Sequence, residues 1–370
     1  MRYSELDWLR VILIFAVFLH HVFMPFNGDG WHVMNGESSK VLDDIMVYFE
    51  QIRLQVLFFI AGAGSLLLLN KVDSVSFLKS KLHRLLVPLL VGMIFIVPPQ
   101  NYFENISEYK NFTDAYTQLM WSFDNNHLWF IEYLIVFMVL ASPLYKLIKS
   151  PFGLGLQQKL DTLSASKYGL AGLALPLIVI RLVTKAYFPE NNNQIENLSV
   201  SLYFFYFFIV GMFFINSRDV WVNLVNHRLI HLKLLILVSV LFYSYYYSPD
   251  LSDYASLFVR WQIWWLLCTL VSWAGLLTIV GYAIHLCKTT PKWLKAINEL
   301  IYPFYIFHQT IIVCFAYYIV QWELGIAFKS ITLLVSSLLV TSAICFWLIK
   351  PIKPMRYLFG LKPTKLNDEK

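Results

Sequence analysis

Ten apolar stretches, separated by charged or polar loops, recur along this sequence of 370 residues. A helix needs about 20 apolar residues to cross the hydrocarbon core of a bilayer. Lipid offers no partner to backbone N–H and C=O groups, so stretches of this kind cross it as helices. We therefore expect an all-α, polytopic membrane protein with about ten transmembrane helices, near 8–26, 47–69, 84–99, 128–148, 168–188, 200–216, 231–248, 256–286, 299–320 and 328–349.

Three of these spans are unusual in length. The third and the sixth are short enough to be re-entrant, and 256–286 is long enough to be tilted or broken. The composition agrees with a membrane class, because 58% of the residues are hydrophobic and only 14% are charged, against roughly 25% charged in soluble proteins. The net charge of +6 does not favour a nucleic-acid partner, since membrane proteins collect Lys and Arg in their cytoplasmic loops.

Loop charge tests the number of spans. With a cytoplasmic N-terminus, the segments predicted inside hold 21 of the 29 Lys and Arg residues, the segments predicted outside hold four, and the spans hold four. A miscounted span would mix these sets. We therefore expect both termini in the cytoplasm, with 1–350 as the membrane domain and 351–370 as a short basic cytoplasmic tail.

The first apolar stretch carries polar side chains at both ends. Eleven residues of α-helix advance about 20° beyond three full turns, so Arg10 and His21 share one face, about 16 Å apart along the axis. Asp7 lies on the same face and can pair with Arg10. Arg10 could instead extend to the cytoplasmic interface, and His21 could anchor the other end. Three further imidazoles are expected near the outer surface: His20, His32 and His127. Imidazole exchanges protons near neutral pH, so we expect at least one of these histidines to take part in the chemistry of the protein.

Three arginines fall within predicted spans: Arg53, Arg181 and Arg260. A guanidinium is costly in lipid, so each should face the bundle interior or a wet cavity. Glu50 or Glu132 could be their structural partners. With the nearby tryptophans, the arginines also suit a carbohydrate, whose hydroxyls need donors and whose rings need stacking surfaces.

A basic cluster opens the third span, where Lys79, Lys81, His83 and Arg84 occur within six residues. Such a cluster is typical of a cytoplasmic loop end. Binding of phosphate groups is the alternative interpretation.

Five motifs follow one another along the chain. They are DWLR at 7–10 with His21 after ten further residues, FFIAG at 58–62, KLHR at 81–84, HLWF at 127–130 and YPFYIFHQ at 302–309. Together they resemble the acyltransferase-3 family of membrane acyltransferases, with Ala61 in place of a usual serine and Lys81 in place of a usual arginine. WHV at 31–33 and RLQVLFF at 53–59 are most similar to its glucan biosynthesis protein C branch.

The resemblance implies a multi-pass protein of the bacterial cytoplasmic (inner) membrane, in contact with the lipid bilayer. It implies acyl-CoA as the donor substrate and an extracytoplasmic glycan as the acceptor, with no cofactor and no metal. His308 stays open between lining a donor tunnel and making a hydrogen bond between packed helices. The expected roles are catalytic for His21, Arg10 and His127, donor-binding for Lys81, Arg84 and His308, and acceptor-binding for His32, Arg53, Arg181 and Arg260.

The expected function is that of an O-acyltransferase moving an acetyl or succinyl group from cytoplasmic acyl-CoA to a hydroxyl of an extracytoplasmic glycan. Such a reaction needs a base for the hydroxyl, and His21 is the candidate. The alternative is a proton-coupled transporter or flippase for a glycan intermediate. Carriers of that kind normally use carboxylates at mid-membrane, whereas Glu50 and Glu132, the acidic candidates within the spans, are expected near the outer ends.

Overall fold

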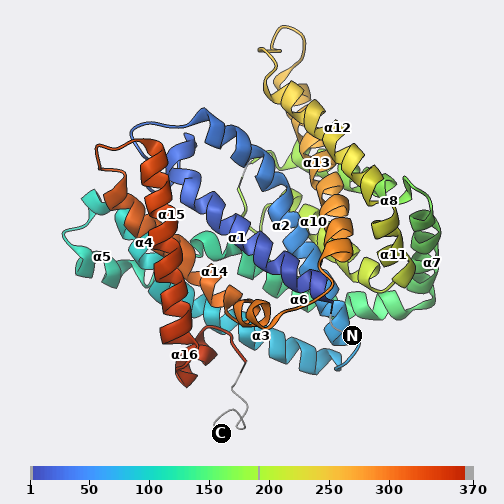
Figure 1. The fold of residues 1–370 in the computed structure, drawn as a ribbon, viewed down its shortest axis with the longest axis horizontal. Coiled ribbons are helices and arrows are strands. Elements are labelled where there is room, and N and C mark those ends of the chain that lie inside the picture. The colour runs from blue at the N-terminus through green and yellow to red at the C-terminus, as the bar shows by residue number, and fades with distance from the viewer. Residues whose placement is uncertain (1–2, 191, 363–370) are drawn as a thin grey trace. The chain divides into compact units, whose positions relative to one another are not determined.

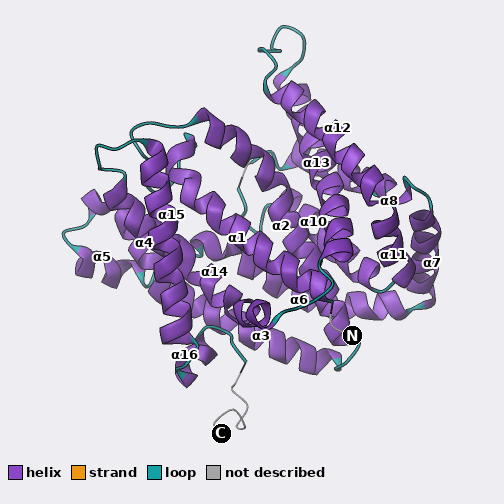
Figure 2. Cartoon of the chain, viewed as in Figure 1, coloured by secondary structure: helices purple, strands orange, loops and turns teal. Residues whose placement is uncertain are grey.

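The computed structural model describes residues 3–190 and 192–362. All regular secondary structure in these residues is helical, and they contain no strand (Figures 1 and 2). Within these residues, ten helical segments are long and apolar enough to cross a membrane, which confirms the predicted number. They are Ser4–Asn27, Lys40–Leu69, Ser74–Glu104, Asn126–Lys149, Gly169–Tyr187, Leu198–Ile215, Arg228–Tyr246, Leu257–Leu286, Lys292–Ile319 and Ile326–Ile349.

One of the three unusual spans differs from expectation. The third is not short, because Ser74–Glu104 has 31 residues. Its first turns carry Lys79, Lys81 and Arg84, whose charges hide them from a search for apolar runs. The span expected at 256–286 is one unbroken helix, α13 (Leu257–Leu286).

The described chain folds into two compact units. Helices α1 (Ser4–Asn27), α2 (Lys40–Leu69), α3 (Ser74–Val91) and α6 (Trp129–Lys149) contribute residues to both. The first unit consists of residues 3–10, Phe49–Leu78 and Val136–Thr290. Its remaining helices are α7 (Pro151–Ala165), α8 (Gly169–Gly172), α9 (Ala174–Tyr187), α10 (Leu198–Ile215), α11 (Arg218–Asn226), α12 (Arg228–Tyr246) and α13.

Close helix packing organises the first unit. Helix α13 packs along both α12 and α9, and the antiparallel run of α12 and α13 is visible in Figure 1. Glycines allow α2 and α10 to cross closely: a Cβ on Gly62 would overlap the carbonyl of Phe208, and a Cβ on Gly211 would overlap that of Phe59. Small residues at such crossings are typical of membrane helices, where van der Waals packing drives association.

The second unit consists of Val11–Tyr48, Lys79–Ile135 and the described part of 291–370. Its helices are η1 (Gly92–Ile96), α4 (Val97–Glu104), η2 (Ile106–Glu108), α5 (Phe112–Leu119), η3 (Asn126–Leu128), α14 (Lys292–Ile319), α15 (Ile326–Ala343), η4 (Ile344–Ile349) and α16 (Lys353–Leu358). Helix α14 packs against α4 and α15.

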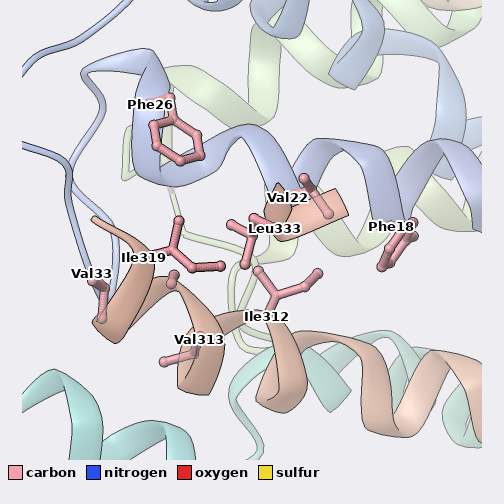
Figure 3. Close-up of a cluster of buried hydrophobic side chains, with 9 residues drawn as sticks. Phe18, Val22, Phe26, Val33, Ile312, Val313, Ile319 and Leu333 are labelled. Atoms are coloured by element: carbon pink, nitrogen blue, oxygen red, sulfur yellow. The ribbon is translucent and has the colours of Figure 1, made fainter. Parts of the chain in front are cut away.

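A hydrophobic cluster joins α1 to α14 within the second unit. Figure 3 shows Phe18, Val22 and Phe26 of α1 on the side that faces Ile312 of α14, and all four side chains are fully buried. Residues four apart on a helix lie on one face, so the buried stripe of α1 fixes which of its other residues also face α14. His21 and His308, each within one turn of this cluster, belong to the same two helices.

A π-helical turn, η1, interrupts the third span. Pro98 and Pro99 lie just after it and supply no N–H, so helical bonds to carbonyl groups within this turn are missing. The hydroxyl of Thr310 on α14 donates to the carbonyl oxygen of Ile96, the last residue of the turn, at 2.7 Å. Turns of this type are frequent at functional sites. The Thr310 hydrogen bond links this one to α14, the helix that carries His308.

Candidate functional site

His21 and His308 form a hydrogen-bonded pair in the second unit. His21 Nδ1 lies 3.0 Å from His308 Nε2. The other ring nitrogen of His308, Nδ1, lies 2.5 Å from the carbonyl oxygen of Tyr305. A carbonyl oxygen only accepts, so His308 Nδ1 carries the hydrogen and, in the neutral ring, Nε2 accepts from His21. The neutral His21 therefore has its hydrogen on Nδ1 and its lone pair on Nε2, the atom that can take a proton.

His127 lies beside this pair, with its ring centroid 5.5 Å from that of His308. Its Nε2 donates to the carbonyl oxygen of Ile306 at 3.0 Å, and its Nδ1 faces the amide Nε2 of Gln100 at 3.4 Å. The hydroxyl of Tyr305 donates to the backbone carbonyl of His127. Both ring nitrogens thus connect to neighbouring helices, which suits a residue that positions α14. Its predicted catalytic role stays a prediction.

The local backbone explains how His127 reaches α14. It lies in the 3-10 turn η3, whose first residue, Asn126, has φ +38°. Non-glycine residues in this region are strained, and such strain is concentrated at functional sites. On the facing turn η1, a Cβ on Gly92 would lie 2.5 Å from Leu128 Cδ1. A larger residue there would displace the Leu128 side chain.

We call His21, Trp31, Gln100, His127, Tyr305 and His308 the histidine cluster. Trp31 belongs to it because its ring stacks on that of His21, with centroids 6.2 Å apart and planes inclined by 22°. Within residues 3–190 and 192–362, no group of three or more His, Cys, Asp or Glu side chains is arranged to hold a metal ion.

A second hydrogen-bonded network lies beside the histidine cluster, and we call it the amide network. Asn101 Nδ2 donates to Asp124 Oδ2 at 2.8 Å, and Asn126 Nδ2 donates to Asn101 Oδ1 at 3.2 Å. Gln309 Nε2 donates both to Asn126 Oδ1 at 2.8 Å and to His32 Nε2 at 3.1 Å. The network ends where His32 Nδ1 lies 2.5 Å from Glu104 Oε2.

Chain neighbours are divided between the two networks. At four places one residue belongs to the histidine cluster and the adjacent residue to the amide network. These pairs are Trp31 with His32, Gln100 with Asn101, His127 with Asn126, and His308 with Gln309.

The predicted donor-binding residues Lys81 and Arg84 lie on α3 in the second unit. Arg84 Nε donates to the carbonyl oxygen of Gly360 at 2.9 Å. Gly360 has φ +71°, and a Cβ there would lie 2.7 Å from the carbonyl oxygen of Arg84. The donor role of both residues stays a prediction.

The described part of the expected cytoplasmic tail (351–370) is folded. Arg356 is buried, and its Nη2 lies 2.7 Å from Glu299 Oε1 on α14 and 2.7 Å from the carbonyl oxygen of Lys362. Residues 350–362, the C-terminal segment, thus pack on the second unit, and 363–370 lie outside the described residues.

The remaining predicted residues belong to the first unit, where they have local partners. Arg10 pairs with Asp7, at 4.0 Å between Nη1 and Oδ1. Arg181 stacks on the rings of Tyr203 and Trp265, at 4.5 and 4.7 Å from their centroids. Arg53 is buried on α2. Their predicted roles stay predictions.

Arg260 is also in the first unit, and its Nη1 binds Asp250 Oδ1 at 2.8 Å. The pKa of Asp250 is lowered chiefly by hydrogen bonds from the hydroxyl and backbone N–H of Ser252, with a smaller effect of Arg260. An acceptor-binding role for Arg260 also stays a prediction.

Sequence reasoning thus found the four histidines of the two networks, His21, His32, His127 and His308, but not the groups that orient them. It missed Gln100, Tyr305, Gln309 and Glu104 as site residues. The YPFYIFHQ motif held a signal for two of these, because Tyr305 lies three residues before His308, at helical spacing, and Gln309 follows His308 directly.

Comparison with protein families gives a match over most of the chain. The family described as "Acyltransferase domain", the acyltransferase-3 family, matches residues 3–350. The comparison with solved structures gave no match.

Curated proteins of similar sequence include "Glucans biosynthesis protein C" of Escherichia coli strain K12, which is 27% identical over 219 residues. The proteins of the same name from Escherichia coli O1:K1 / APEC and from strain E24377A of serotype O139:H28 are 26% identical over 219 residues. Each match covers 56% of this chain and 56% of the relative, so the chain spans little more than half the length of these relatives.

Proposed function

Because the chain belongs to the acyltransferase-3 family of membrane acyltransferases, we propose that it moves an acetyl or succinyl group from acyl-CoA to a hydroxyl of a glycan. The curated relatives named for glucan biosynthesis support a glycan as the acceptor. Acyl-CoA as the cytoplasmic donor, a glycan on the outer side and a location in a bacterial inner membrane complete the proposal.

His21 is the proposed general base. Its Nε2 takes the proton of the acceptor hydroxyl while the hydroxyl oxygen attacks the thioester carbonyl carbon. The resulting tetrahedral intermediate collapses, the C–S bond breaks, and the CoA thiolate leaves and recovers the proton from the His21 imidazolium. The observation that carries this proposal is the bond between His308 Nδ1 and the Tyr305 carbonyl, because it sets which nitrogen of His21 holds the lone pair.

His308 has a second effect when His21 becomes protonated. The bond from His21 Nδ1 to His308 Nε2 is then charge-assisted, and such bonds are roughly twice as strong as neutral ones. An interaction that strengthens in the transition state accelerates the reaction. We therefore assign His308 to positioning His21, in addition to its predicted place near the donor.

The donor's phosphates would be held by Lys81 and Arg84, with His32 nearer the acceptor. The transporter or flippase predicted as an alternative has weaker support, because the matching family is one of acyltransferases. The hydrogen-bond directions around His21 also fit a base that must present one defined nitrogen.

The test uses the purified full chain in proteoliposomes, with radiolabelled acetyl-CoA or succinyl-CoA and a glucan acceptor. Transfer of label to the glucan is expected for the unaltered protein. His21→Ala should reduce it by a factor of about 10² to 10⁴. His20→Ala is the matched control and should keep most of the activity. No transfer from either donor would overturn the proposed function, and an active His21→Ala protein would overturn the proposed base.

A further inference from the structure

Trp31, a member of the histidine cluster, also contacts the amide network. One neighbour of its ring is His21, and another is His32, whose ring lies edge-on with centroids 5.0 Å apart. A group bound against the exposed part of Trp31 and beside His32 would therefore lie next to the proposed base.

The loop that carries Trp31 and His32, residues 28–39, is held at several points. The backbone N–H of Asn35 donates to the carbonyl of Pro25 at 2.9 Å. The ammonium of Lys329, a buried residue of α15, donates to Asn35 Oδ1 and to the carbonyl of Val320, each at 2.8 Å. A binding group is precise only when supporting bonds fix it, and this loop meets that condition.

Hydrogen-bond directions in the amide network are set at both of its ends. Asp124 and Glu104 are carboxylates, which accept only when ionised. Asn101 must therefore turn its NH₂ to Asp124, and each following amide is oriented in turn as far as Gln309. Gln309 then donates to His32 Nε2, so the hydrogen of His32 is on Nδ1, where Glu104 accepts it.

Exposure increases along the amide network from Gln309 to Glu104. Gln309 is only 3% exposed, whereas the side chains of His32 and Glu104 are 12% and 39% exposed. Gln309 thus holds His32 in place from the buried side, and His32 in turn holds Glu104. The carboxylate of Glu104 is open to a ligand. Glu104 uses Oε2 for His32, and a carboxylate has further lone pairs for hydroxyl donors.

We propose that Trp31, His32 and Glu104 form the subsite that binds one neutral sugar ring of the acceptor beside His21; this inference rests on the proposed function. A sugar presents C–H groups, which pack against an aromatic ring, and hydroxyls, which donate to a carboxylate. The negative face of an indole ring suits the first, and a charge-assisted hydrogen bond suits the second. The amide network holds Glu104 and His32 in the geometry of the bound state.

The test measures binding without a donor, so that it does not depend on catalysis. The purified full chain in nanodiscs is titrated calorimetrically with short neutral glucose oligomers of several linkages. The unaltered protein should bind at least one of them. Glu104→Gln and Trp31→Ala should each weaken that binding about tenfold or more, as expected for one lost hydrogen bond to a charge or one lost aromatic contact.

Trp31→Phe keeps an aromatic ring and should recover most of the affinity. Trp121→Ala is the matched control, because Trp121 is 66% exposed on the same unit and belongs to neither network. It should bind as the unaltered protein does. Thermal denaturation of each variant checks that it is folded.

Kinetics separate this inference from the proposed function. With Glu104→Gln, the KM for the glucan should rise about tenfold while kcat and the KM for acyl-CoA change less than twofold. Binding that is equal in all four variants, or absent from the unaltered protein, would overturn the subsite. A lower kcat with an unchanged glucan KM would also overturn it. Failure of acyl transfer with intact, Glu104-dependent oligomer binding would instead overturn the proposed function and leave the subsite supported.

Discussion

Two substitutions of His308 separate its two hydrogen bonds. The side-chain oxygen of Gln reaches about as far from the backbone as Nε2 of His, so His308→Gln keeps an acceptor for His21 Nδ1. Asn reaches only about as far as Nδ1, so His308→Asn keeps a donor for the Tyr305 carbonyl and loses the bond to His21. The pair therefore tests which bond supports catalysis.

The expected size of the effect follows from the charge that develops on His21. In the transition state the lost bond is one from an imidazolium, and hydrogen bonds to charged groups contribute about 1.5–3 kcal/mol. The ground state loses a neutral bond of about 0.5–1.5 kcal/mol, so the difference that acts on kcat is about 1–1.5 kcal/mol. Since about 1.4 kcal/mol corresponds to tenfold in rate, His308→Asn should lower kcat by about 5- to 12-fold. His308→Gln should lower it by less than about threefold, because its acceptor remains.

The assay is acyl transfer to glucan in proteoliposomes, normalised to the amount of folded protein. Normalisation matters because each variant loses one hydrogen bond of the ground state: His308→Gln no longer donates to the Tyr305 carbonyl, and His308→Asn no longer accepts from His21. Each loss lowers stability by about 0.5–1.5 kcal/mol. Equal kcat in both, or a kcat in His308→Asn equal to that of the unaltered protein, would refute the orienting role of His308.

Thr310→Val should lower the free energy of unfolding by about 0.5–1.5 kcal/mol, because the hydrogen bond to the carbonyl of Ile96 is lost; thermal denaturation in detergent measures this, with Thr310→Ser as the control that keeps the hydroxyl. Gly360→Ala should release the C-terminal segment, since its Cβ would press on the Arg84 carbonyl in a left-handed backbone; limited proteolysis should cut that segment faster, and an unchanged rate would contradict the packing described here. A reporter tag inserted within 104–120 should be accessible from outside the cell, and a cytoplasmic signal would contradict the predicted orientation.

The number of spans could be predicted from sequence because hydropathy depends only on local composition. The start of the third span could not, since Lys79, Lys81 and Arg84 lower the hydropathy of turns that are nevertheless helical. Nor did composition reveal that part of the tail packs on the second unit, because that depends on single contacts such as the one between Arg356 and Glu299.

The candidate site was predictable only in part. Imidazole side chains are rare and chemically distinctive, so His21 and His308 could be selected from the sequence. Their pairing joins residues 287 positions apart, and no local pattern encodes it. Gln100 and Gln309 gave no signal for the same reason: an amide becomes informative only when its partners are known.

The division of chain neighbours between the two networks has a thermodynamic consequence. His308 and Gln309 share one stretch of α14 backbone, as Gln100 and Asn101 share one stretch of α4. A shift of either helix large enough to change one network therefore displaces the other. If sugar binding at Glu104 changes the proton affinity of the His21–His308 pair, linkage requires that protonation of the pair change sugar affinity by the same factor. Acceptor affinity would then vary with pH even where the sugar contacts no group of the histidine cluster that titrates.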